Sequence, residues 1–272
     1  MDERLQLRVQ RHGWDRAAAH YEASWQAPLD VARRVLLDRQ PVCPGDRVLD
    51  VACGTGLLTH ELACKAGPGG QVFGIDLSQA MVDAARSRQS PAGSASSHYI
   101  RMDAQSLEFP SASFDLVLCC FGLMYVPDPE RALAEMRRVL RPGGRLGIAI
   151  WGERARCAWA PVFSIVDAEV ASEVCPLFFS LGAEGVLARA CHAAGLVVTW
   201  QARLIGALSH RDADEACDAM FLAGPAALAW SRFGEQVRAR VRRSYLDAIE
   251  PWRAASAYVL PAEFVCLQAH PS

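Results

Sequence analysis

The part of the chain that most constrains its fold is residues 48–56, with the sequence VLDVACGTG. The β-branched run Arg47–Val51 is typical of a buried parallel strand, and Leu57–Ala66 has the pattern of a helix. Glycines between a strand and a helix allow a tight turn and let the backbone approach a ligand closely. Residues 48–56 therefore predict a ligand-binding turn, although an ordinary strand-helix turn can carry the same glycines.

Strands and helices are predicted to alternate regularly up to Trp151. Ser78 and Asp128 are favourable N-caps for two of the helices, and Pro129 suits the first position of the second one. The alternation predicts an α/β fold, namely a doubly wound, mostly parallel, seven-stranded Rossmann-like sheet, whose ligands bind at the carboxyl ends of the strands. After the first strand, we expect strands at Val72–Asp76, Tyr99–Met102, Leu116–Cys120 and Leu146–Ile150.

The two ends of the chain have different patterns from this alternating part. Trp14, Ala18, Tyr21 and Trp25 recur at helical spacing, which predicts an N-terminal helical cap. After Trp151 we expect a helix at Glu184–Ala194, a strand at Leu196–Leu204, several helical segments, and a last strand at Ala262–Gln268. The predicted domains are a helical lid (1–40), a ligand-binding Rossmann-like core (41–208), a helical insertion or substrate lid (209–255), and the final strand of the core (256–272).

Composition argues against several classes of function. The formal net charge is −2, without the basic excess expected of a protein that neutralises phosphates, so no nucleic-acid partner is predicted. The chain shows neither an apolar N-terminal leader nor a stretch of about 18 uncharged apolar residues, which predicts a cytoplasmic protein without a membrane span. The ten cysteines are scattered without zinc-ligand spacing, so we expect buried thiols and no metal site.

Acidic residues follow the second and third predicted strands. Asp76 lies 20 residues after Gly56, where a carboxylate can accept hydrogen bonds from both hydroxyls of a ribose. Asp76 could instead cap the following helix, although Ser78 already suits that role. Asp103, next to Ala104, could accept from an adenine amino group or could be an ordinary solvated loop residue. Together with the glycine turn, these acids favour a nucleoside ligand.

These motifs resemble those of the class I S-adenosylmethionine-dependent methyltransferases, in particular the methyltransferase type 11 group, which includes the ubiquinone and menaquinone C-methyltransferases. The resemblance covers residues 45–151 and includes a fourth motif at 115–123 and a turn at 138–146. It implies S-adenosylmethionine as cofactor and S-adenosylhomocysteine as product. The residues expected around the cofactor, including our own addition of Tyr21 from the N-terminal helix, are Tyr21, Asp50, Ala52, Gly54, Thr55, Gly56, Asp76, Leu77, Met81, Asp103, Ala104 and Cys119.

Some residues depart from the pattern of the group. Members often have glycine where this chain has Ala52. The quinone methyltransferases usually continue Phe-Gly-Leu with Arg-Asn-Val, whereas here Leu123 is followed by Met124, Tyr125 and Val126. The carboxyl-terminal half does not resemble theirs either, so a quinone acceptor is disfavoured.

The acceptor is predicted to be a small aromatic or apolar molecule, methylated on oxygen, nitrogen or carbon in biosynthesis or secondary metabolism. Methyl transfer needs alignment of the reacting atoms, and a base only where the acceptor must lose a proton. Candidate bases are His20, Tyr21, His98, Tyr125 and His210. The aromatic residues expected to line the substrate pocket are Trp25, Tyr125, Trp151, Trp159, Phe179 and Phe221.

Two other functions stay open from the sequence. An NAD-dependent oxidoreductase also has a glycine turn and a ribose-binding acid, but its fingerprint requires glycine at position 59, which here is Thr59. A non-catalytic subunit that binds S-adenosylmethionine would carry the same motifs, because a fold does not dictate a function. The partners expected are a small-molecule substrate and, at most, a second copy of the chain, as a monomer or homodimer.

Overall fold

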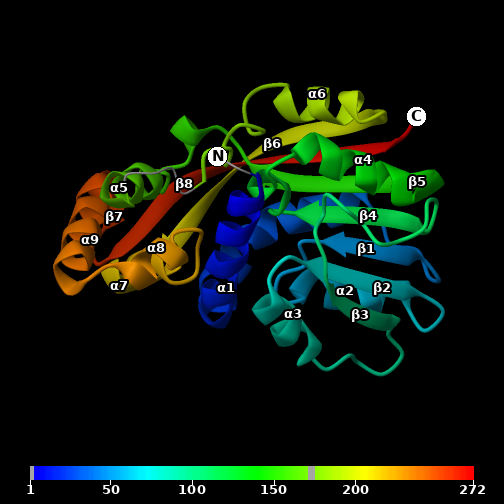
Figure 1. Cartoon of the computed structure of the whole chain (residues 1–272), viewed down its shortest axis with the longest axis horizontal. Helices are drawn as coiled ribbons and strands as arrows, with labels where there is room; N and C mark the ends of the chain where they lie inside the picture. Colours follow the sequence, from blue (N-terminus) through cyan, green and yellow to red (C-terminus); the bar gives the residue numbers. More distant parts are fainter. Residues whose placement is uncertain (1–2, 171–174) are drawn as a thin grey trace.

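The computed structural model describes residues 3–170 and 175–272, so residues 1 and 2 of the predicted lid lie outside it. The strands form one sheet in the order β3-β2-β1-β4-β5-β8-β6, which Figure 1 shows as neighbouring arrows, with the two-residue β7 paired to β8 as an eighth strand. The bounds of the strands are β1 (Arg47–Val51), β2 (Gln71–Asp76), β3 (Ser96–Arg101), β4 (Phe114–Cys120), β5 (Leu140–Trp151), β6 (Leu196–His210), β7 (Arg253–Ala254) and β8 (Ala257–Pro271).

Helices pack around this sheet and connect its strands. Ser78 and Asp128 cap two of them as predicted, since each side chain accepts a hydrogen bond from a backbone N–H of the first helical turn. The described helices are α1 (Glu3–Arg39), α2 (Leu57–Ala66), α3 (Gln79–Arg86), α4 (Pro129–Val139), α5 (Pro161–Val170), α6 (Val186–Ala193), α7 (Ala213–Phe221), α8 (Ala227–Arg232) and α9 (Glu235–Ile249), with short 3-10 turns at Leu123–Tyr125, Arg154–Arg156 and Glu250–Trp252.

The strands β1 to β5 are parallel, and β8 runs antiparallel between β5 and β6. This arrangement confirms the predicted doubly wound, mostly parallel Rossmann-like class. The central parallel strands β1 and β4 bury most of their residues, as the burial of Val48, Leu49 and Leu116 illustrates. Their carboxyl ends therefore meet at one edge, where the glycine turn lies.

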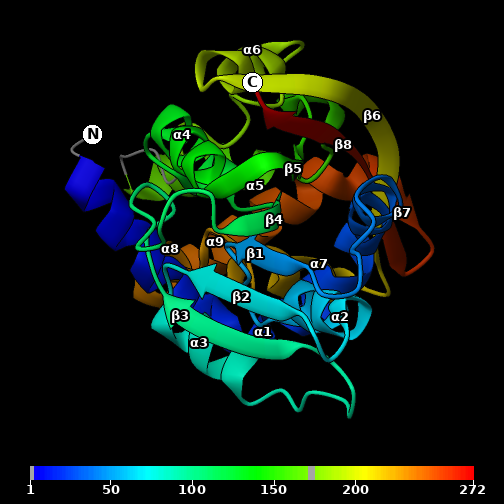
Figure 2. The same cartoon turned by 90° about the vertical axis from the view of Figure 1, so that its right-hand side faces the viewer.

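The structure corrects the predicted bounds of several strands. β6 continues to His210, beyond the predicted end at Leu204, and β8 begins at Ala257 instead of Ala262. These two strands pair along their whole length, from Leu196 with Pro271 to His210 with Tyr258, so backbone pairing extends them past the apolar core segment. The predicted insertion is therefore helical only from α7 to α9, with strand residues at both ends. Figures 1 and 2 show β6 and β8 curving away from the parallel strands to carry these helices.

Two further strands also differ from their predicted ranges. β5 begins at Leu140 rather than Leu146, and β3 spans Ser96–Arg101 rather than Tyr99–Met102. β3 is the edge strand of the sheet and has several exposed residues, so apolar content alone gives a poor guide to its ends.

Helix α1 lies between the parallel strands and the helices α7–α9 (Figure 1). Its residues Ala32 and Leu36 are fully buried in the core, and the Gln40 side-chain amide just after it donates to the Leu146 carbonyl at 2.8 Å. At the other end, the Asp15 carboxylate accepts from the Ser78 hydroxyl at 2.6 Å. The N-terminal helix is therefore joined both to the core and to the start of α3.

Candidate functional site

The turn after β1 has an unusual backbone. Gly54 and Gly56 have φ angles of 54° and 81°, and Ala52 has 58° although it carries a Cβ atom. A left-handed conformation costs a non-glycine residue roughly 1–2 kcal/mol, which explains why glycine suits position 52 in related sequences. A Cβ atom added to Gly122, just after β4, would lie 2.2 Å from the Ala52 Cβ atom. The ends of β1 and β4 thus approach each other closely at this turn.

Asp76, at the end of β2, faces this turn. Its two carboxylate oxygens accept from the backbone N–H groups of Gly54 and Ser78, each at 2.9 Å. Each oxygen keeps a second lone pair for a ligand, and Ser78 is the residue that caps α3. Burial raises the pKa of the Asp76 carboxyl to about 6. The carboxylate is therefore fixed in place and well suited to accept hydroxyl donors.

Asp50, in β1, is 1% exposed and incompletely satisfied. Its Oδ2 atom accepts from the Thr59 hydroxyl at 2.6 Å, while its Oδ1 atom has no hydrogen-bond partner in the described chain. The buried hydroxyl oxygen of Thr55 also lacks a partner there. Burial raises the pKa of the Asp50 carboxyl to about 7. Because unpaired buried polar groups are costly, these atoms indicate a site for a cationic or hydrogen-bonding ligand.

Asp103 follows β3 at the same edge of the sheet. Its carboxylate accepts from the backbone N–H of Gln105 at 2.9 Å and contacts the Gln105 side-chain amide at 3.2 and 3.3 Å. Gln105 in turn accepts from the backbone N–H of Asp128 at 2.9 Å. These contacts link the loop after β3 to the start of α4 and orient Asp103 beside the apolar Met102 and Ala104.

Two pockets follow the sheet edge under α1. The first, of about 710 Å³ including its open mouth, is lined by Leu7, Gln10, Trp14, Tyr21, Ala52, Gly54, Ile75, Asp76, Leu77, Met81, Met102, Asp103, Ala104, Cys120, Phe121, Gly122, Tyr125 and Val126. The second, of about 560 Å³, is lined by Tyr21, Trp25, Gln26, Leu29, Arg33, Asp50, Ala52, Cys53, Gly54, Thr55, Leu57, Leu58, Cys120 and Phe121. Residues of α1 therefore complete both pockets.

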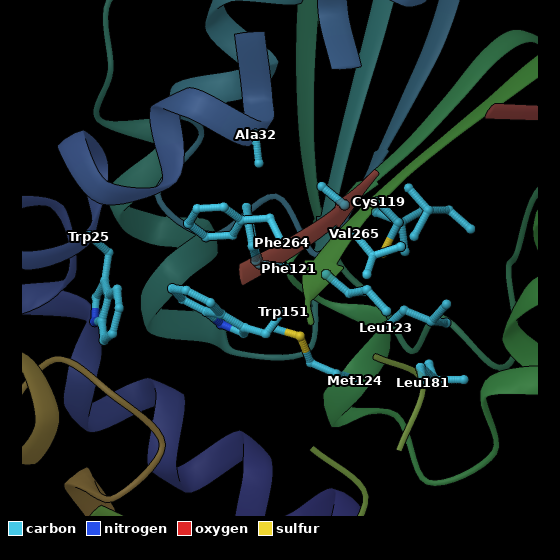
Figure 3. Packing of buried hydrophobic residues seen from close by; sticks show 14 of the residues in the cluster. Trp25, Ala32, Cys119, Phe121, Leu123, Met124, Trp151, Leu181, Phe264 and Val265 are labelled. Atoms are coloured by element: carbon cyan, nitrogen blue, oxygen red, sulfur yellow. The ribbon is translucent and has the colours of Figure 1, made fainter. Parts of the chain in front are cut away.

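A third, smaller pocket is almost entirely aromatic, and we call it the aromatic chamber. It is lined by Trp14, Tyr21, Trp25, Leu29, Phe121, Met124, Tyr125, Trp151, Trp159 and Pro225, and it measures about 310 Å³ including its open mouth. Figure 3 shows Trp25 opposite the rings of Phe121 and Trp151. The Trp25 indole N–H donates to the Ala223 carbonyl at 3.1 Å, which ties α1 to the loop between α7 and α8.

Tyr21 and Phe121 line all three pockets. Phe121 has a φ angle of 61°, so its ring is presented from a strained backbone at the end of β4. Burial raises the pKa values of the Tyr21 and Tyr125 hydroxyls, which therefore stay protonated at neutral pH. The two tyrosines lie where the acid-lined pockets and the aromatic chamber meet.

The three candidate histidines do not line these pockets in the described chain. His20 is exposed on another side of α1, and His98 stacks on Phe73 with 4.9 Å between ring centroids. His210 is 3% exposed at the end of β6, and burial lowers its pKa, which keeps the ring neutral. Their positions give no support to a role as base at the site.

Four other predicted site residues also lie outside these three pockets. Gly56 instead allows close packing, because a Cβ atom there would lie 2.9 Å from the Ala85 Cβ atom. Cys119 is buried in β4, and its neighbour Cys120 lines the pockets. Phe179 packs against Trp159, and Phe221 stacks on Trp230 beyond α1. The other predicted cofactor and substrate residues line at least one pocket.

Sequence reasoning missed several lining residues. Leu7, Gln10 and Arg33 contribute from α1, and Phe121 and Gly122 from the end of β4. The helical stripe that contains Trp14 could have identified the face of α1 that covers the site. Arg33 gave no signal of its own, because arginines are scattered along the whole chain.

Comparison with known proteins places this site in a family context. Residues 49–148 match the family model described as a methyltransferase domain. The ubiquinone/menaquinone biosynthesis C-methyltransferase UbiE of Ectopseudomonas mendocina is 43% identical over 42% of this chain and 45% of its own length. The chain thus spans about half the length of the curated relatives it matches. The family match includes the turn after β1 and the end of β4, and it leaves out α1 and the residues after Ile148.

Solved structures resemble the chain over a longer range. The YcgJ protein of Bacillus subtilis gives a TM-score of 0.61 at 15% identity and covers 89% of this chain and 99% of its own. The [4+2]-cyclase SpnF gives a TM-score of 0.58 at 25% identity over 91% of this chain and 83% of its own. The predicted family resemblance and Rossmann-like fold are thereby confirmed, and the family match supports the predicted S-adenosylmethionine cofactor.

The described residues offer neither a metal-binding group nor a membrane-spanning helix. Residues 3–170 and 175–272 hold no group of three histidine, cysteine or acidic side chains arranged to bind a metal ion. Among the same residues, every helix is too short or too polar to cross a bilayer.

Proposed function

We propose that this chain transfers the methyl group of S-adenosylmethionine to a small aromatic or apolar acceptor, on oxygen, nitrogen or carbon, as a step in biosynthesis. One observation carries the proposal. Tyr21 and Phe121 line both the acid-lined pockets and the aromatic chamber. Acid-lined pockets on one side fit a nucleoside with a charged tail. The aromatic chamber on the other side offers ring surfaces that an apolar acceptor would contact when the side chains around it make room.

The first pocket has the groups needed for adenosine. Asp76 would accept from the ribose hydroxyls through its free lone pairs, and Asp103 would accept from the adenine amino group. The side chains of Leu77, Met81 and Met102 provide apolar walls for the base. This donor and acceptor set suits a purine nucleoside.

The second pocket has the groups needed for an amino-acid tail. The unpaired Oδ1 atom of Asp50 and the unpaired hydroxyl of Thr55 would bind an ammonium group. Arg33 lines the same pocket, and its guanidinium already contacts Asp30 at 3.1 Å and Glu61 at 2.9 Å. It would also attract a carboxylate, since a guanidinium has five N–H donors.

When bound, S-adenosylmethionine supplies a methyl group on a positively charged sulfur. Tyr21 and Phe121 exclude water from the junction of the three pockets, and ring faces attract positive charge. The aromatic chamber then holds the acceptor close to that junction, so the chain acts mainly by alignment. Neither tyrosine hydroxyl acts as a base, because burial keeps both protonated.

A second candidate function comes from the likeness to the cyclase SpnF, which extends over 91% of this chain. A cyclisation within one molecule needs an apolar cavity that holds the reactant in a folded shape, and the aromatic chamber provides one. Such a reaction would leave S-adenosylmethionine intact. A non-catalytic subunit would also leave it intact and would give no product of any kind.

The proposal is tested by incubating the chain with methyl-labelled S-adenosylmethionine and a panel of phenols, amines and polyketide-like scaffolds. We expect label in one acceptor class and an equal amount of S-adenosylhomocysteine. The matched control is Asp76→Ala, which should abolish labelling at low cofactor concentration. Conversion of an acceptor without label transfer would favour cyclisation, and cofactor binding without any conversion across the panel would favour a binding subunit.

A further inference from the structure

A second recess lies on the far side of α1 from the cofactor pockets, between α1, α8 and the start of α9. We call it the outer groove; it measures about 620 Å³ including its open mouth. Its lining consists of Arg16, His20, Phe221, Leu222, Ala227, Trp230, Ser231 and Arg238. It shares no lining residue with the cofactor pockets or the aromatic chamber. Helix α1 separates them, with Ala17 fully buried within it.

The outer groove collects basic side chains without acidic ones. Arg16 and His20 lie one turn apart on α1 and so share a face, and Arg238 approaches from α9. Among the described residues, no carboxylate lines the groove or forms an ion pair with Arg16 or Arg238. In a chain whose net charge is −2, this is a local concentration of positive charge.

Arg238 differs from the next arginines on its own helix. Arg240 pairs with Glu169 at 2.6 Å, and Arg242 pairs with Asp214. Arg238 instead donates from Nε to the Trp230 carbonyl at 3.1 Å, and its guanidinium carbon lies 5.4 Å from the centre of the Trp230 ring. These contacts orient the guanidinium beside an aromatic surface without neutralising its charge.

The floor of the outer groove is flat and rigid. Trp230 stacks on Phe221 with 4.6 Å between ring centroids and 15° between ring planes. Phe221 is 1% exposed and also contacts Tyr245 of α9, so this stack is anchored in the core. With Phe221 on one face of the Trp230 ring and Arg238 over it, a planar apolar group would pack against the ring edge while its anionic group meets the guanidinium of Arg238.

We propose that the outer groove binds a small organic anion that has a carboxylate or phosphate joined to a planar apolar body. Arg238 forms the charged end of the site with Arg16, and Trp230 forms the apolar end. This binding site is additional to the proposed methyl transfer and does not depend on it.

The test uses 2-naphthoate as probe and neutral 2-naphthamide as its isostere, with binding measured by calorimetry on the full chain. We expect 2-naphthoate to bind at least tenfold more tightly than the amide and to be displaced by inorganic phosphate at millimolar concentration. Arg238→Gln should weaken 2-naphthoate binding at least tenfold. Arg240→Gln, two residues further along α9, is the matched control. It should change the affinity for 2-naphthoate less than twofold.

Two further measurements keep the test decisive. Arg16→Gln removes a groove cation that has no ion pair in the described chain, so it should weaken 2-naphthoate several-fold without lowering the unfolding temperature. Asp76→Ala should leave 2-naphthoate binding unchanged while it weakens S-adenosylhomocysteine. Equal affinity for the acid and the amide, or equal loss in Arg238→Gln and Arg240→Gln, would overturn the proposal, because either result places the probe elsewhere.

Discussion

The acid-lined pockets at the turn after β1 and the aromatic chamber share Tyr21 and Phe121, yet they are built by different means. In the turn, backbone geometry determines the site, with left-handed φ angles at Ala52, Gly54 and Gly56 and backbone N–H groups that fix Asp76. The chamber is instead made by side chains from distant parts of the chain. Trp25 and Trp159, for example, are far apart in sequence, but their ring centroids are 6.0 Å apart.

This difference explains which part of the site the family match covers. The match to the methyltransferase domain covers residues 49–148, which includes the turn and both acidic residues Asp50 and Asp76. Trp25 and Trp159 of the chamber fall outside it. A cofactor that many enzymes share can be held by one backbone arrangement, whereas the acceptor pocket must change with each substrate.

The largest effect is expected from adding a single methyl group where the ends of β1 and β4 contact each other. We expect Gly122→Ala to weaken S-adenosylhomocysteine binding at least 100-fold, because the new Cβ atom would lie 2.2 Å from the Ala52 Cβ atom and displace the turn. Calorimetry measures the loss, and circular dichroism checks that the fold persists. Gly234→Ala is the control, since a Cβ atom there meets nothing within 4 Å. Unchanged affinity would show that the turn adapts easily.

The next largest effect is expected at Asp76, the acid proposed to bind the ribose. Asp76→Ala should weaken S-adenosylhomocysteine binding by about 1–3 kcal/mol, roughly 5- to 150-fold, through lost hydroxyl partners and loss of the contacts to Gly54 and Ser78. Titration calorimetry measures this loss. Asp83→Ala, an exposed acid on the adjoining α3, should change the affinity less than twofold. Equal effects of the two substitutions would remove Asp76 from the site.

Sequence reasoning succeeded where a local rule applied and failed where contacts are distant. The place of Asp76 at the pocket edge could be predicted because ligands of doubly wound sheets bind at the carboxyl ends of the strands. The true length of β6 was missed because its pairing with β8 depends on residues about 60 positions away, such as Leu208 with Leu260. Phe221 has the same aromatic character as Trp25, and only the packing of α8 places it on the far side of α1.

The acidic residues Asp50 and Asp76 predict that ligand binding at the turn depends on pH. The aromatic chamber gives no such prediction. The pKa values of Asp50 and Asp76 are raised to about 7 and about 6 in the free protein. A ligand that needs both carboxylates ionised lowers these pKa values, so binding releases protons and the affinity falls as the pH drops. We expect roughly 20-fold weaker S-adenosylhomocysteine binding at pH 6 than at pH 8. Calorimetry in buffers of different ionisation enthalpy would detect the protons, and binding without proton release would contradict the assignment.

The smallest expected effect concerns the aromatic chamber itself. Tyr125 packs edge-on against Trp14 and Phe178, and burial raises the pKa of its hydroxyl, so it should stay protonated and contribute shape rather than basicity. With an acceptor from the labelling screen, we expect Tyr125→Phe to change kcat less than about threefold and to leave its pH profile in place. Trp151→Leu, which opens the chamber wall, should raise the acceptor KM while the affinity for S-adenosylhomocysteine stays the same. Tyr125→Phe could instead lower kcat more than 100-fold and remove one limb of the pH profile. That result would show that the chamber contains a base, and it would contradict the contrast between a chamber that contributes shape and pockets that contribute charge.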